Sequence, residues 1–67
     1  MQTGNRIKIL RLKQLMTQEQ LAEKVGIAPA TLSRIENNKH SPSLSTLREL
    51  TKALNIDVTE LVDFEKE

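Results

Sequence analysis

The 67-residue chain contains no cysteine, no tryptophan and no tyrosine, and its single aromatic residue is Phe64. Without cysteine it can form neither a disulfide nor a thiolate zinc site, and its one histidine, His40, cannot hold a metal by itself. We therefore expect no metal and no cofactor. The core has to consist of Leu, Ile, Val and Ala side chains, which suits packed helices better than a β-sandwich rich in aromatic residues.

Long apolar runs are also missing. No stretch approaches the roughly 18 apolar residues of a membrane span, and the N-terminus lacks the apolar segment of a signal peptide. The length allows one small domain, which we expect to be soluble and cytoplasmic, with no membrane partner. An enzyme is the least favoured class, because no nucleophile, base and orienting residue converge in the sequence.

Charge is segregated along the chain, although the net charge is only +1. Residues 1–48 carry eight Lys or Arg and three Glu, a net of +5, whereas residues 49–67 carry two Lys and six Asp or Glu, a net of −4. If the N-terminal part faces DNA, the acidic part should lie on the far side, where it does not repel phosphate. A solvated surface with uneven ends is the alternative explanation.

The most informative stretch is residues 18–36, where two short helical patterns follow each other closely. Thr17 and Gln20 form a capping-box pattern before the first, and Gly26 can adopt the left-handed backbone conformation that a sharp bend requires. The inward positions of both patterns are apolar and recur at helical spacing: Leu21, Ala22, Val25, Leu32 and Ile35. This arrangement predicts a helix-turn-helix.

The outward face of the second helix, about residues 29–37, carries small or hydrogen-bonding side chains, so the helix could enter a DNA major groove. Arg34 is the best candidate for reading a base, because its guanidinium offers two parallel donors that match guanine O6 and N7. Ala30 could contact a thymine methyl, and Thr31 and Ser33 could bond to bases or phosphate. The alternative for Arg34 is a solvent-exposed helix charge.

Six short motifs share a consistent spacing along the chain: Met16-Thr17-Gln18, Leu21-Ala22, Val25-Gly26-Ile27, Leu32-Ser33-Arg34-Ile35-Glu36, Asn37-Asn38-Lys39 and Pro42-Ser43-Leu44. Together they resemble the Cro/C1-type (Xre-like) helix-turn-helix family of bacterial and phage regulators. The similarity covers residues 5–64. We expect an all-α, lambda repressor-like DNA-binding domain, a compact bundle of five short helices, between a flexible start at residues 1–4 and a tail at residues 65–67.

Outside the helix-turn-helix, the patterns predict helices over about residues 5–14, 44–54 and 58–63. The middle one has an apolar stripe that we expect to turn inward: Leu44, Leu47, Leu50 and Leu54. Ile9 and Leu12 lie off the main stripe of the first helix. We expect them to pack under the C-terminal residues, with a partner surface as the alternative.

The resemblance implies roles for individual residues. Pro29, Ala30 and Arg34 would face base edges, although the first two can make only apolar contacts. Gln18, at the positive end of a helix, would contact a phosphate and support the recognition helix. Asn37 and Lys39 would form a second phosphate contact, with a solvated loop lysine as the alternative for Lys39.

The resemblance also implies a structural feature, a partly buried ion pair between Arg11 and Glu36. Three positions depart from the family pattern. Leu15 stands where glycine is frequent, so we do not expect a left-handed residue there. Ala28 replaces the usual Ser or Thr N-cap, and Asn38 replaces a glycine whose left-handed conformation it can adopt.

We interpret the chain as a sequence-specific, double-stranded-DNA-binding transcriptional regulator, most simply a repressor, that acts as a homodimer on an inverted-repeat operator in the nucleoid. One small domain neutralises few phosphates, so useful affinity requires two copies. The C-terminal end offers the candidate dimer surface: Val58, Val62 and Phe64. Two alternatives remain, a protein-interaction module with the same fold, such as an antitoxin or adaptor subunit, and the N-terminal part of a longer regulator.

Overall fold

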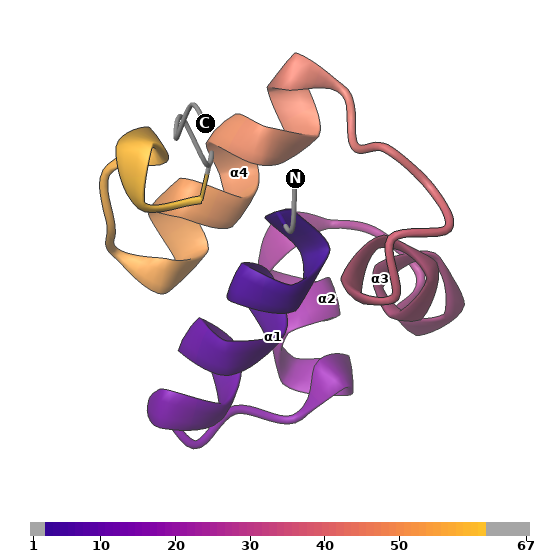
Figure 1. Ribbon diagram of the computed structural model, residues 1–67. Coiled ribbons are helices and arrows are strands. Elements are labelled where there is room, and N and C mark those ends of the chain that lie inside the picture. Colours follow the sequence, from indigo (N-terminus) through magenta and orange to yellow (C-terminus); the bar gives the residue numbers. More distant parts are fainter. Residues whose placement is uncertain (1–2, 62–67) are drawn as a thin grey trace.

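The computed structural model describes residues 3–61, which form four α-helices and one short 3-10 helix (Figure 1). The helices are α1 (Thr3–Lys13), α2 (Gln18–Val25), α3 (Pro29–Glu36) and α4 (Leu44–Leu54), followed by η1 (Val58–Glu60). In the view of Figure 1, α3 lies on the right of the molecule and η1, in yellow, on the left. None of the described helices combines the length and the apolar character needed to cross a bilayer.

The predicted all-α class is confirmed, but the predicted number of five helices is wrong for the described residues. The helix expected over residues 58–63 is instead the single 3-10 turn η1, closed by the bond from Leu61 N to Val58 O at 3.0 Å. A left-handed residue, Asn55, ends α4 just before it. The Leu61 side chain that follows η1 is fully buried in the core. Tertiary packing therefore stabilises this segment, although it is too short to be stable as an isolated helix.

Helix α1 begins at Thr3, two residues before the predicted start, and therefore includes residues that the sequence assigned to a flexible start. The cause is a close approach to α3. Gly4 is buried, its N–H donates to Asn38 Oδ1 at 3.1 Å, and an added Cβ would lie 2.0 Å from Ile35 O. The first turn of α1 is thus fixed by α3 and by Asn38, the second residue after it.

The core contains apolar residues from every helix: Ile7, Leu21, Ala22, Leu32, Ile35, Leu50, Leu54 and Leu61. The predicted inward stripe of α4 is correct for Leu50 and Leu54, while Leu47 is half-buried against the core. It is wrong for Leu44, which is 70% exposed. Periodicity indicates the side to which a residue points, but Leu44 lies in the first turn, where no neighbouring element covers it.

The helix ends follow the predicted chemistry with one exception. Thr17 and Gln20 form the capping box, Gly26 is left-handed at φ +85°, and Asn38 is left-handed at φ +59°. Leu15 is also left-handed, at φ +59°, contrary to our expectation. Two hydrogen bonds between Arg11 and Met16 close the turn between α1 and α2 and hold Leu15 in this conformation: Met16 N donates to Arg11 O at 3.1 Å, and Arg11 Nη1 donates to Met16 O at 2.8 Å.

Candidate nucleic-acid interface

Helix α3 presents one face to the core and the other to solvent. It starts after Ala28, an extended residue that offers no side-chain cap, and Pro29 occupies the first helical turn as predicted. Because Leu32 and Ile35 are buried, the opposite side of the helix points outward. Pro29 and Ala30, in the first turn of α3, are therefore exposed to solvent.

The structure places most of the predicted DNA-contacting residues on this outward side or beside it. Four residues of α3 and its C-cap are exposed: Pro29, Ala30, Arg34 and Asn37. Thr31 and Ser33 are half-buried, and Lys39 is exposed in the connection to α4. Within α3, Arg34 is the one exposed charged residue, because Glu36 is buried and paired with Arg11, and Lys39 adds an exposed cation after the helix.

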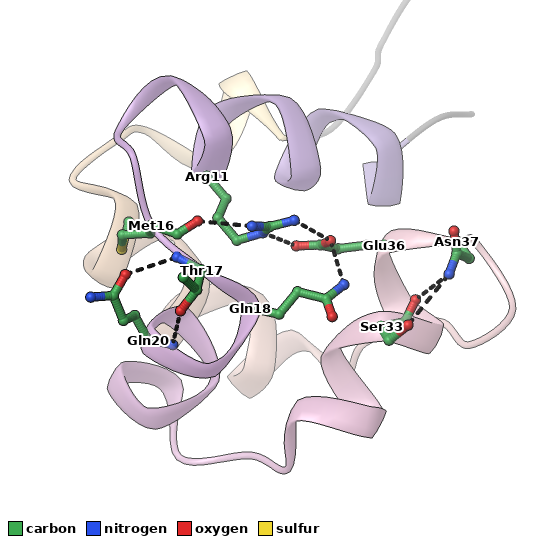
Figure 2. A network of polar contacts seen from close by, with 8 residues as sticks. All are labelled: Arg11, Met16, Thr17, Gln18, Gln20, Ser33, Glu36 and Asn37. Atoms are coloured by element: carbon green, nitrogen blue, oxygen red, sulfur yellow. Dashed lines mark hydrogen bonds and ion pairs between the residues drawn. The ribbon is translucent and has the colours of Figure 1, made fainter.

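Asn37 has a structural contact in addition to its predicted role. Its side-chain Nδ2 donates to Ser33 O at 2.9 Å and lies 3.5 Å from Ser33 Oγ (Figure 2). Ser33 O also accepts the backbone N–H of Asn37 at 3.0 Å, so the side chain adds a second bond to the same carbonyl at the end of α3. The 3.5 Å contact with Ser33 Oγ is the weaker of the two, and its N–H is the one that Asn37 can redirect to a phosphate.

A buried ion pair joins α1 to the end of α3, as the family resemblance implied. Arg11 Nε donates to Glu36 Oε2 at 2.7 Å, and Arg11 Nη2 donates to Glu36 Oε1 at 3.1 Å (Figure 2). A third guanidinium nitrogen, Nη1, donates to Met16 O at 2.8 Å. This bidentate pair has the planar geometry that arginine and carboxylate favour, and the additional bond satisfies the buried guanidinium.

Gln18 extends this network to α2. Its Nε2 donates to Glu36 Oε1 at 3.0 Å, so one carboxylate connects α1, α2 and α3 (Figure 2). The sequence-based assignment of Gln18 to a phosphate missed this bond, because spacing within α2 does not reveal which residue of α3 faces it. One amide N–H of Gln18 remains available beside the free N–H groups of the α2 N-terminus.

Other predicted site residues lie elsewhere. Val58, named for the dimer surface, is exposed in η1, while Val62 and Phe64 lie outside the described residues. Within residues 3–61, no group of three His, Cys, Asp or Glu side chains is placed to hold a metal ion.

Known proteins share the helix-turn-helix of this chain. Residues 7–61 match the family described as helix-turn-helix. An immunity repressor protein of Bacillus phage phi105 is 44% identical over 62 residues, which cover 92% of this chain and 43% of the repressor. The antitoxin HipB of Escherichia coli K12 is 36% identical over 58 residues, covering 87% of this chain and 66% of the antitoxin. The chain therefore spans less than two thirds of the length of these relatives.

Relatives of similar length also exist. An HTH-type transcriptional regulator of Archaeoglobus fulgidus is 37% identical over 62 residues, covering 92% of this chain and 89% of that protein. The crystal structure of the restriction-modification controller protein C.AhdI from Aeromonas hydrophila superposes with a TM-score of 0.88 at 30% identity, covering 91% of this chain and 92% of the controller. With its helix-turn-helix motif at α2 and α3, the chain belongs to the Cro/C1-type helix-turn-helix family.

Proposed function

We propose that this chain binds double-stranded DNA sequence-specifically and regulates transcription, as a repressor, with α3 as the recognition helix in the major groove. The observation that carries the proposal is the outward side of α3, where Ala30 and Arg34 are exposed. The buried Glu36 holds this helix in place through its bonds to Arg11 and Gln18. A rigid helix with small side chains and one bidentate donor fits direct readout. The names of the relatives, a phage repressor and transcriptional regulators, support this function.

Arg34 is the proposed base reader, through guanine O6 and N7, while Pro29 and Ala30 make apolar contacts with base edges. Thr31 and Ser33 are half-buried hydroxyls that contact a base edge or a phosphate. Gln18, Asn37 and Lys39 contact backbone phosphates on either side of α3. Gln18 does so with the N–H that its internal hydrogen bond leaves available, and Asn37 with the N–H of its weaker contact to Ser33.

The proposed active form is a homodimer on an inverted repeat, with half-sites about one helical turn apart. The exposed Val58, together with Val62 and Phe64 of the chain, is the proposed contact between the copies. A regulator of this kind works in the cytoplasm, at the nucleoid. We propose no catalytic activity, in line with the relatives described above, none of which is named as an enzyme.

The test is selection from a random DNA duplex library at near-physiological salt, followed by sequencing of the retained duplexes. We expect an inverted repeat, and Arg34→Ala should remove the preference at one base pair per half-site, a loss of about 1–3 kcal/mol there. Arg48→Ala, which removes an exposed arginine of α4, is the matched control and should retain the repeat. An unchanged motif in Arg34→Ala would reject Arg34 as base reader, and failure to retain any duplex would reject DNA binding.

A second candidate function is a protein-interaction module, favoured by the similarity to the antitoxin HipB. Salt dependence separates the two functions. DNA binding should weaken steeply between low and physiological salt as counterions return to the phosphates, whereas an apolar protein interface should respond little.

A further inference from the structure

Helix α1 carries an exposed apolar stripe that the DNA-binding function does not use. Ile9 is 46% exposed, Leu12 is 52% exposed and Leu15, just beyond the helix, is 90% exposed. The C-terminal tail, under which we expect Ile9 and Leu12 to pack, lies outside the described residues. Large apolar side chains grouped on one element in this way are more typical of an interaction site than single exposed residues are.

The stripe points away from the DNA-binding side. The buried residues Gly4, Ile7 and Arg11 define the inward face of α1. Gly4 donates a hydrogen bond to Asn38, and Arg11 pairs with Glu36 of α3. Since each residue advances a helix by about 100°, Ile9 lies on the opposite face. Ile9 lines a shallow groove between α1 and η1, and Figure 1 shows η1 and α3 on opposite sides of the molecule.

Charges beside the stripe restrict what can bind to it. Lys8 and Lys13 are exposed on its two flanks, and α1 contains no Asp or Glu; the carboxylate that lines the groove, Glu60, belongs to η1 on the opposite wall. A second copy that packed the same stripe against this one would bring lysines close to lysines, which is unfavourable at an interface. An occupant with carboxylates on both sides of its apolar residues would gain attraction at both flanks.

We propose that the outer face of α1 is a docking site for an acidic amphipathic segment of a partner protein. Aliphatic or aromatic residues of that segment contact Ile9, Leu12 and Leu15, and its Asp or Glu residues meet Lys8 and Lys13. The proposal does not depend on DNA binding. Because the site lies away from α3, a partner can occupy it while the protein remains on its operator.

The experiment uses the whole chain and a fluorescent peptide of about 14 residues that forms an amphipathic helix, with Leu at helical spacing and Glu on both flanks. Fluorescence anisotropy gives its Kd, and amide NMR shifts show where it binds. We expect shifts along α1, with no shifts in α3. Leu12→Ser should raise the Kd about tenfold or more, and the double variant Lys8→Glu, Lys13→Glu should abolish binding.

Two controls separate docking from general charge attraction. Lys24→Glu reverses an exposed lysine on α2 and should leave the Kd unchanged, as should Leu44→Ser, which removes an exposed leucine outside the stripe. All α1 variants should retain operator binding, so a failure of this proposal is distinguishable from a failure of the DNA-binding function.

Three results would overturn the proposal. An unchanged Kd for Leu12→Ser would show attraction between charges alone. Failure of the peptide to bind up to about 1 mM would show that the stripe does not accept an acidic amphipathic segment. Finally, NMR contacts between Leu12 and residues 62–67 in the peptide-free chain would show that the protein covers its own stripe.

Discussion

The two helices of the helix-turn-helix have equal length, eight residues each, but they are held in different ways. Helix α2 is closed by residues next to it in sequence, the capping box of Thr17 and Gln20 at its start and the left-handed Gly26 at its end. Helix α3 begins at Ala28 without any side-chain cap. The helix proposed to read DNA is thus the one with the weaker local N-terminal signal.

Contacts distant in sequence secure α3 instead. Glu36 binds Arg11, 25 residues away, and Gln18, 18 residues away, while Asn38 accepts a hydrogen bond from Gly4, 34 residues away. Local caps decide whether a helix forms, and nonlocal bonds decide where it is placed. A recognition helix depends on its placement, because base readout requires defined donor positions.

The largest effect should come from removing the shared carboxylate. Glu36→Ala leaves the buried Arg11 guanidinium without its counter-charge and removes the acceptor of Gln18. We expect the free energy of unfolding to fall by about 3–5 kcal/mol, measured by urea denaturation. A loss below about 1 kcal/mol would show that the network does not hold α3.

A double replacement sharpens this test. Arg11→Met with Glu36→Leu removes both charges and keeps apolar volume, so most of the lost stability should return. If the double variant is as unstable as Glu36→Ala, the loss of stability comes from altered packing and not from an unpaired charge on the buried Arg11.

Gly4→Ala should have the next largest effect. The added Cβ would meet Ile35 O at 2.0 Å and Asn38 Oδ1 at 2.7 Å, so the first turn of α1 has to move away from α3. We expect a loss of about 1–3 kcal/mol in thermal or urea denaturation. Since alanine favours helices over glycine by roughly 0.5–1 kcal/mol, a stabilised variant would contradict this close approach.

Removing the N-cap hydroxyl of α2 and adding one to α3 tests how differently the two helices depend on local capping. Thr17→Ala removes the acceptor for Gln20 N and should cost about 1 kcal/mol. Ala28→Ser supplies the missing hydroxyl at α3 and should add roughly 0.5–1 kcal/mol, measured by the same denaturation curves. If Ala28→Ser changes nothing, nonlocal contacts already fix the start of α3.

Leu15→Gly should have the smallest effect. Glycine removes the cost of a left-handed leucine, about 1–2 kcal/mol, but adds roughly 0.5–1 kcal/mol of chain entropy to the unfolded state. A net gain of about 0.5 kcal/mol is expected, with Leu15→Ala as the control that keeps the strained backbone. Destabilisation by both variants would show that the exposed leucine makes a stabilising contact.

Much of the local structure could be predicted from the residue types. Apolar spacing located α2 and α3 and identified Leu50 and Leu54 as buried. The pairing of Arg11 with Glu36 was also expected, but from the family resemblance, since no spacing rule connects residues on separate helices. Leu44 shows the limit of periodicity, because an inward direction does not ensure a neighbour to pack against.

Features that depend on local chemistry could therefore be predicted from the sequence alone. These are the capping box of Thr17 and Gln20, the left-handed Gly26 and Asn38, and the small side chains on the outward face of α3 with Arg34. The tertiary structure alone decided the early start of α1 at Gly4, the left-handed Leu15, the reduction of the last helix to η1 and the bond from Gln18 to Glu36. The start of α1 and the bond of Gln18 follow from contacts 34 and 18 residues apart, η1 ends at the buried Leu61, and the buried Arg11 side chain closes the turn at Leu15; in each case the free energy of these contacts outweighs the preference of the local sequence.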